Sequence, residues 1–135
     1  MLIERYKYRK ASPMYGIDSF GEAINKAKIN STKAEVEAYY INRDYFDFKH
    51  DYDFEEIITN MPFSLNKGDE EKIRDIYKRF FEYSRKLLSR GAVVVIYSRN
   101  PDFARKYSEK YNYVLQKEVL ISQKENAYVF IYRKR

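Results

Sequence analysis

The most regular pattern of apolar positions in the chain lies in residues 69–90. Apolar side chains recur there every three or four residues, which is the spacing of one face of an amphipathic helix. Gly91 follows the pattern and is the expected C′ residue that ends this helix. The predicted apolar face consists of Ile73, Ile76, Tyr77, Phe80, Phe81, Ser84, Leu87 and Leu88.

The run Ala-Val-Val-Val-Ile-Tyr-Ser at 92–98 shows no alternation of apolar and polar residues. Such a run is typical of a strand buried on both faces, in a parallel sheet that helices cover. Shorter strands are predicted at 12–18, 35–42 and 55–60, and residues 43–53 are predicted to form a loop.

Two further helices are expected on either side of these strands. Apolar residues at helical spacing predict one over residues 20–31, with Ser19 as its N-cap and Glu22 as the capping-box partner. A shorter helix is predicted to begin at Pro101, because Asn100 can cap it and proline is favoured at a first helical position.

The end of the chain predicts an antiparallel hairpin. Residues 113–122 and 127–135 read as strands, and four polar residues separate them. The resulting order of strands and helices belongs to the α/β class. Because 135 residues suffice for one hydrophobic core and no linker interrupts them, a single domain over 1–135 is expected.

Composition narrows the classes of function. An excess of 26 Lys and Arg over 20 Asp and Glu favours a polyanionic partner such as nucleic acid, although a compositional bias of the source organism would also raise Lys. The chain has no cysteine and a single histidine, His50, so neither a disulfide framework nor a zinc site is expected. No metal, no membrane segment and no signal peptide are predicted, and a cytoplasmic protein is expected.

Candidate chemistry lies at residues 59–63, Thr-Asn-Met-Pro-Phe, where a predicted strand gives way to a helix. Ligands in open α/β sheets bind beyond the carboxyl ends of strands. The side-chain oxygen of Asn60 and the carbonyls beside Pro62 can accept hydrogen bonds from an exocyclic amino group. Phe63 can stack on a base, a contact of about 1–3 kcal/mol. Asp18 ends another predicted strand.

Residues 57–64, Ile-Ile-Thr-Asn-Met-Pro-Phe-Ser, resemble the Asn-Pro-Pro-Tyr/Phe signature of class I S-adenosylmethionine-dependent methyltransferases that modify amino groups of bases. Residues 15–31 resemble the second motif of that fold, and residues 41–48 the third. The segment after the signature most resembles the THUMP-associated RNA guanine-N2 methyltransferases. The resemblance implies an α/β, Rossmann-like methyltransferase sheet that ends in the antiparallel hairpin.

The resemblance also implies S-adenosyl-L-methionine as cofactor and RNA, either tRNA or rRNA, as partner. An acid at the end of the second strand would bind the cofactor ribose, and an acid in the third motif would contact its adenine, with Asp47 as the alternative for the latter. The residues implied for the base are Asn60, Pro62 and Phe63, and those implied for the cofactor are Asp18, Ser19, Asp44 and Tyr45.

The chain departs from the family in two places. Met61 stands where the family usually has proline, and the Gly-rich first motif is absent, since the four glycines show no Gly-x-Gly spacing. The chain therefore resembles a catalytic domain that begins after this motif, without the first strand. The strands at 12–18 and 55–60 are then expected to pair directly, or a second copy in a homodimer is expected to fill the gap.

Three functions remain open from the sequence. The first is an RNA methyltransferase that acts on the guanine exocyclic amine. The second is a non-catalytic, truncated methyltransferase-like module that binds RNA or a protein. The third is an adenine-N6 DNA methyltransferase, whose signature has the same Asn-x-Pro-Phe pattern.

Overall fold

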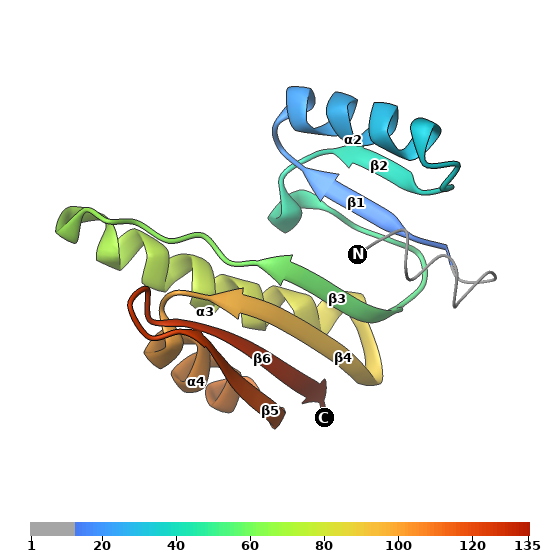
Figure 1. The fold of residues 1–135 in the computed structure, drawn as a ribbon. Coiled ribbons are helices and arrows are strands. Elements are labelled where there is room, and N and C mark those ends of the chain that lie inside the picture. The colour runs from blue at the N-terminus through green and yellow to red at the C-terminus, as the bar shows by residue number, and fades with distance from the viewer. Residues whose placement is uncertain (1–12) are drawn as a thin grey trace. The chain divides into compact units, whose positions relative to one another are not determined.

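The computed structural model describes residues 13–135, which fall into two compact units (Figure 1). The first unit ends at Phe48 and the second comprises Lys49–Arg135. The start of the strand predicted from Ser12 lies outside the described residues. That residues 1–135 act as a single domain stays a prediction.

The first unit is a strand-helix-strand arrangement that ends in one turn of 3-10 helix. The two strands pair in parallel, with Tyr15 opposite Tyr39 and Asp18 opposite Asn42. The predicted strands and helix are therefore present, although both strands are shorter than predicted. Their bounds are β1 Tyr15–Asp18, α2 Gly21–Lys33 and β2 Tyr39–Asn42, followed by the 3-10 helix Tyr45–Asp47.

The prediction that Ser19 caps α2 is wrong. The helix begins at Gly21, with Phe20 in the N-cap position and no side-chain hydrogen bond from it. Instead, the Asp18 Oδ1 accepts a hydrogen bond of 2.8 Å from the Phe20 N–H. This turn carries the chain from β1 into the helix, and Glu22 forms an ion pair of 2.9 Å with Lys26 rather than a capping box.

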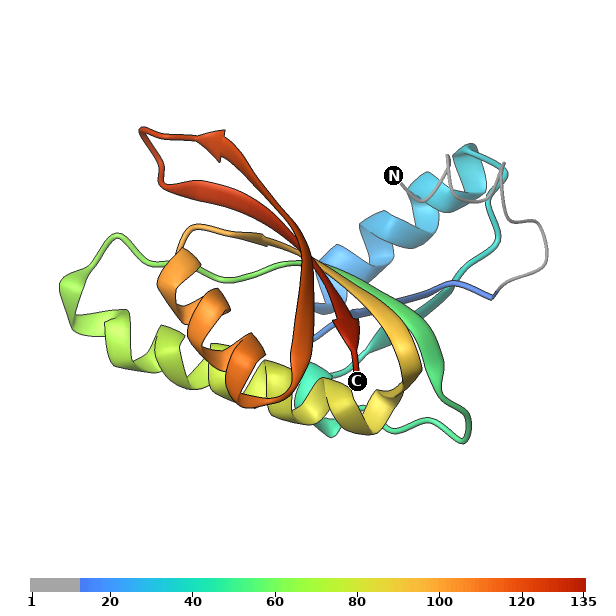
Figure 2. The same ribbon diagram turned by 90° about the horizontal axis from the view of Figure 1, so that it is seen from below.

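The second unit is a four-stranded mixed sheet in the order β3-β4-β6-β5. β3 and β4 pair in parallel, whereas β4 with β6 and β6 with β5 pair antiparallel, so the predicted terminal hairpin is confirmed. Figure 2 shows α3 and α4 on the same face of this sheet. The elements are β3 Phe54–Asn60, α3 Glu70–Leu87, β4 Leu88–Ser98, α4 Pro101–Lys110, β5 Tyr113–Ser122 and β6 Ala127–Lys134.

The prediction that Gly91 ends α3 is also wrong. The helix stops at Leu87, and Leu88 already has extended backbone angles, φ −109° and ψ 138°. Gly91 lies inside β4 with φ +78°, a conformation that costs glycine little. β4 contains a bulge at this point. The register shows it, since Phe54 pairs with Leu88 whereas Glu56 pairs with Val93.

The predicted apolar face of α3 forms the core of the second unit, apart from Ile76, which is only half-buried. Two hydrogen bonds of 2.6 Å join this helix to the sheet, from the Tyr77 hydroxyl to Ser98 and from Ser84 to the Tyr113 hydroxyl. Burial raises the pKa of Tyr77 to about 12. These two contacts satisfy the buried hydroxyls of Tyr77, Ser84, Ser98 and Tyr113.

Direct pairing of residues 12–18 with residues 55–60 is one of the two expected outcomes, and it stays a prediction. The two segments belong to different units, in which β1 pairs with β2 and β3 pairs with β4. The alternative, a second copy of the chain at these strands, stays a prediction. No helix within residues 13–135 is long and apolar enough to cross a membrane.

Replacing Tyr77 by Phe is expected to lower the free energy of unfolding of the second unit by about 1 kcal/mol, because it removes one buried hydrogen bond. Urea unfolding followed by near-ultraviolet circular dichroism measures the change. Tyr97→Phe is the matched control, since no hydrogen bond joins the Tyr97 hydroxyl to a described residue. Equal stability of the two variants would contradict the role of the Tyr77–Ser98 bond.

Replacing Asp18 by Ala is expected to destabilise α2 by about 0.5–2 kcal/mol, because the helix entry loses its side-chain acceptor. Asp18→Asn retains the accepting oxygen and is expected to recover most of the loss. Hydrogen exchange of the α2 amides reads out both variants. If exchange in Asp18→Ala matched that of Asp18→Asn, the turn at Phe20 would not depend on the side-chain oxygen of residue 18.

Candidate functional site

The carboxyl ends of β3 and β4 meet at one edge of the sheet in the second unit. The strands are parallel, and Asn60 at the end of β3 stands opposite Tyr97 in β4. The pairing continues one residue further, because the Met61 N–H donates a hydrogen bond of 2.9 Å to the Tyr97 carbonyl. The segments that follow the two strands therefore begin side by side, where ligands of open α/β sheets bind.

The burial of Met61 accounts for a methionine at the position where the family signature usually has proline. The side chain is 3% exposed, so it packs into the apolar interior beneath the strand end. A flexible, apolar methionine suits such a position. It anchors the backbone there, while Pro62 and Phe63, the next two residues, remain exposed.

Asn60 presents its side chain to solvent at the end of β3. Its amide forms no hydrogen bond with a described residue, although its backbone carbonyl lies 3.5 Å from the Thr59 hydroxyl. The amide oxygen is therefore available to accept a hydrogen bond from a ligand. Asn60, Pro62 and Phe63, the three residues predicted to hold a base, lie together in this one segment.

Arg99, which sequence reasoning missed, covers one side of the Phe63 ring. The guanidinium carbon lies 4.0 Å from the ring centroid, a cation–π contact, and the side chain of Phe63 is still 43% exposed. A base can therefore stack only on the side of the ring that Arg99 leaves open. The available signal was the position of Arg99 directly after the buried strand β4.

The residues predicted to bind cofactor lie in the first unit, at the carboxyl ends of β1 and β2. The Asp18 carbonyl accepts a hydrogen bond of 3.0 Å from the Arg43 N–H. The Asn42 amide nitrogen donates to the carbonyls of Asp18 and Ser19. These contacts hold the backbone before Asp44 against the end of β1.

Each of the two carboxylates uses one oxygen to shape its own loop. The Asp18 Oδ1 accepts from Phe20, and the Asp44 Oδ1 accepts a 2.8 Å hydrogen bond from the Phe46 N–H, which starts the 3-10 helix containing Tyr45. The second oxygen of each exposed carboxylate has no hydrogen bond to a described residue and can accept from hydroxyl or amino groups. These acceptors suit the ribose hydroxyls and the adenine amino group of a nucleoside cofactor.

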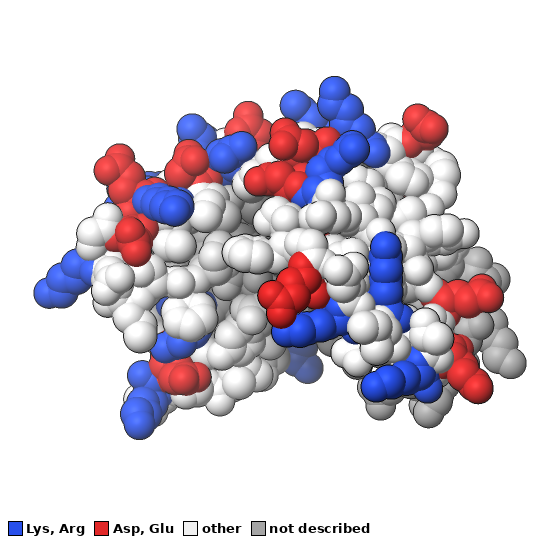
Figure 3. All heavy atoms as spheres, turned by 90° about the horizontal axis from the view of Figure 1, so that it is seen from above, with Lys and Arg blue, Asp and Glu red and all other residues white. Residues whose placement is uncertain are grey.

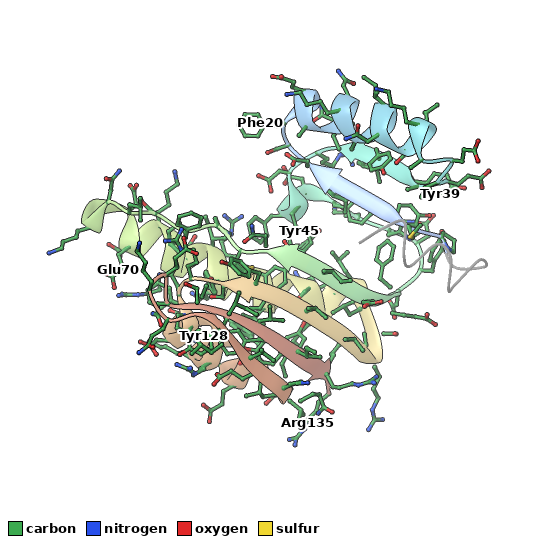
Figure 4. All side chains as sticks on the ribbon, in the orientation of Figure 1. Phe20, Tyr39, Tyr45, Glu70, Tyr128 and Arg135 are labelled. Atoms are coloured by element: carbon green, nitrogen blue, oxygen red, sulfur yellow. The ribbon has the colours of Figure 1, made fainter. Side chains whose placement is uncertain are left out.

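Phe20, the aromatic residue two positions after Asp18, is 74% exposed and projects away from α2 in Figure 4. The residues predicted to bind cofactor, Asp18, Ser19, Asp44 and Tyr45, thus lie in the first unit, and the residues predicted to hold a base lie in the second.

Charges on the molecular surface are mixed in sign. On the face drawn in Figure 3, Lys and Arg alternate with Asp and Glu among the described residues, without a continuous basic patch. Within residues 13–135, no group of three His, Asp or Glu side chains is placed to hold a metal ion. Basic charge by itself therefore does not outline a binding surface on this face.

Solved structures share this fold at low sequence identity. A possible methylase from Clostridium difficile 630 is 23% identical with a TM-score of 0.71, covering 92% of this chain and 32% of its own. TrmN from Thermus thermophilus is 18% identical with a TM-score of 0.82, covering 98% and 40%. A predicted N6-adenine-specific DNA methylase from Listeria monocytogenes str. 4b F2365 is 19% identical with a TM-score of 0.66, covering 90% and 30%.

These neighbours establish an α/β, Rossmann-like methyltransferase fold, and the chain spans less than half the length of each of the three. No curated protein matches the chain. The family model described as "RMKL-like, methyltransferase domain" matches residues 2–125, which include the Asn60–Phe63 segment and both carboxylate loops. The chain therefore belongs to the RMKL-like methyltransferase domain family.

Proposed function

We propose that the chain is the catalytic part of an S-adenosylmethionine-dependent RNA methyltransferase that modifies the N2 amino group of guanine in tRNA or rRNA. The observation that carries the proposal is the Asn60–Phe63 segment. It combines a free amide acceptor with an exposed aromatic ring at the carboxyl end of a parallel strand. Membership of a methyltransferase family supports the reaction class.

The residues of the second unit act by positioning. Asn60 accepts a hydrogen bond from the guanine amino group, and the carbonyl of Met61 or Pro62 accepts a second. Both acceptors favour the positive charge that develops on the nitrogen during transfer. Phe63 stacks on the base, which must be flipped out or single-stranded. Holding the reactants in line contributes roughly 7–11 kcal/mol to such reactions.

The residues of the first unit would hold the cofactor, which supplies the methyl group for direct transfer to nitrogen. Asp18 would bind the ribose hydroxyls beside Ser19, and Asp44 the adenine amino group beside Tyr45. The proposal rests on the free oxygen that each carboxylate retains after its backbone hydrogen bond. A homodimer in which a second copy extends β1 or β3 is part of the same proposal, because within its own sheet of described strands each of the two has one paired neighbour.

Two observations support alternatives. The likeness to a predicted N6-adenine-specific DNA methylase favours adenine N6 as the target amine, since the same two acceptors would serve either base. The absence of a Gly-x-Gly sequence favours a module that binds RNA or a protein without binding cofactor. A measurement of cofactor binding distinguishes an enzyme from a module that binds no cofactor. The identity of the modified base distinguishes a guanine-N2 enzyme from an adenine-N6 enzyme.

Calorimetric titration of the chain with S-adenosylmethionine is expected to show binding that Asp18→Asn weakens about tenfold or more, because a carboxylate accepts more strongly than an amide. This variant keeps the oxygen that shapes the loop, so α2 remains intact. Glu22→Gln is the control, because it removes an exposed carboxylate in the first turn of α2. No heat at millimolar cofactor would exclude an active enzyme in this polypeptide.

Asn60→Ala is expected to lower kcat/KM for methyl transfer about 100-fold, as removal of one transition-state hydrogen bond typically does, while the fold is unchanged because the side chain is exposed. Asn25→Ala on the exposed side of α2 is the matched control. Radiolabelled methyl transfer to unmodified tRNA and rRNA gives the rates. RNA with inosine in place of guanosine lacks the N2 amine, so continued methylation of it would exclude guanine N2.

A further inference from the structure

Positively charged residues gather at the amino-terminal end of β4, the end opposite to the candidate site. Three segments contribute them: the last turn of α3, the start of β4 and the end of β6. The chain runs from α3 directly into β4, and the antiparallel pairing of Val93 with Arg133 places the end of β6 beside the start of β4. The residues, together called the basic surface, are Arg85, Lys86, Arg90, Arg133, Lys134 and Arg135.

Hydrogen bonds between the three segments hold the basic surface together. The Arg85 guanidinium donates to the Arg135 carbonyl at 3.0 Å, and the Lys134 ammonium donates to the Arg85 carbonyl at 2.8 Å. The Arg133 guanidinium donates to the Gly91 carbonyl at 2.9 Å. All three acceptors are carbonyl oxygens, which carry no net charge. These bonds therefore fix the side chains without neutralising them.

The basic surface is not balanced by acids. None of its side chains forms an ion pair with a described carboxylate, whereas Arg74 and Arg105 on the two helices of the same unit each do. Burial lowers the pKa of Lys134, and the charge of Arg85 lowers it further, against the opposing effect of Asp53. The cations thus repel one another, and a ligand with negative charge would relieve this repulsion.

Arg90 and Arg135 offer guanidinium groups that the protein itself does not use. Both side chains are exposed, and neither makes a hydrogen bond, ion pair or ring contact with a described residue. The negative end of the α3 dipole accounts for cations such as Arg85 and Lys134, whose side chains bond to carbonyls, but not for these two. Guanidinium groups bind phosphate oxygens through paired donors, so a phosphate-bearing ligand suits them.

Acidic residues border the basic surface and narrow the kind of partner. The start of β3 is acidic and lies on the other side of β4, where Phe54 pairs with Leu88. A broad anionic surface such as a lipid bilayer would meet these acids together with the cations. A single phosphodiester strand can instead follow the cations from β4 to β6 and avoid the acids. The bordering acids are Asp51, Asp53 and Glu55 around the start of β3, and Glu82 on α3.

The length of β4 separates the basic surface from the base-holding segment. At about 3.3 Å per residue, the strand spans roughly 25–30 Å between Arg90 and Arg99. Figure 4 shows Arg135 and Glu70, the first residue of α3, at opposite ends of the second unit. One strand of a stacked nucleic acid rises about 3.4 Å per nucleotide, so roughly eight nucleotides are needed to reach both places.

We propose that the basic surface binds the phosphate backbone of the RNA substrate, at a distance of roughly eight stacked nucleotides from the target nucleotide. This inference rests on the proposed function, because it takes RNA as the substrate. Contacts to phosphates carry no base information, so the basic surface positions the RNA and does not read its sequence.

Titration of fluorescently labelled tRNA with the full chain, followed by anisotropy at several salt concentrations, tests the proposal. The double variant Arg90→Gln, Arg135→Gln is expected to bind about tenfold more weakly at about 100 mM salt. The slope of log K against log salt is expected to become shallower by about 2, because each phosphate contact contributes about 1.

The matched control is the double variant Lys78→Gln, Lys106→Gln, which removes the same charge from exposed positions on α3 and α4. It is expected to bind tRNA nearly as well as the unmodified chain. Equal weakening by the two double variants would overturn the proposal, because binding would then depend on net charge alone.

Two further measurements address folding and the kind of partner. Arg90→Lys, Arg135→Lys is expected to retain most of the affinity, because lysine binds phosphate as a point charge; a loss as large as in the glutamine variant would overturn the phosphate assignment. Polyglutamate and vesicles that contain phosphatidylserine are the competitors. Displacement of labelled tRNA by either one as effectively as by unlabelled tRNA would overturn the choice of a nucleic acid.

The basic surface and the proposed function fail separately in these experiments. Asn60→Ala is expected to lose methyl transfer and to keep its affinity for tRNA. Methyl transfer by the unmodified chain, combined with undiminished tRNA binding by Arg90→Gln, Arg135→Gln, would overturn the basic surface and leave the methyltransferase proposal in place. Weakened tRNA binding by that variant, without methyl transfer by the unmodified chain, would support the basic surface and count against the methyltransferase.

Discussion

The parallel pairing of β3 with β4 is the constraint on which the candidate site depends. The hydrogen bond from the Met61 N–H to the Tyr97 carbonyl carries the pairing past the end of β3. Two segments distant in sequence therefore start at the same sheet edge, one with Asn60 and Phe63, the other with Arg99. The antiparallel neighbour β6 completes the pairing of β4, which leaves β4 buried between two strands.

Hydrogen bonds in the core of the second unit hold the carboxyl end of β4 in place. The Tyr77 hydroxyl on α3 bonds to Ser98, the last residue of β4, and the Ser98 hydroxyl in turn accepts from the Asn100 N–H at 3.0 Å. A single buried serine thus links the helix, the strand end and the start of α4. This explains how a loop that carries Arg99 can hold its guanidinium against an exposed ring rather than extend into solvent.

Local sequence patterns predicted the helices and strands well where burial dictates them. The apolar face of α3, the buried run of β4 and the terminal hairpin follow from side-chain periodicity alone. The errors occurred at element ends, where several residues compete for one role. Ser19 is not the N-cap of α2, because the helix begins one residue later and the Asp18 carboxylate holds the turn at Phe20. Gly91 lies in a β-bulge, because β4 begins directly after α3.

The sequence by itself determined the fold class, the family signature and the residues of each candidate half-site, because these depend on residue type and spacing. Only the tertiary structure decided that the Arg99 guanidinium lies over the Phe63 ring. This contact joins residues more than 30 positions apart, so no local pattern encodes it. It arises because strand pairing brings the two segments together, and pairing partners are a property of the whole sheet.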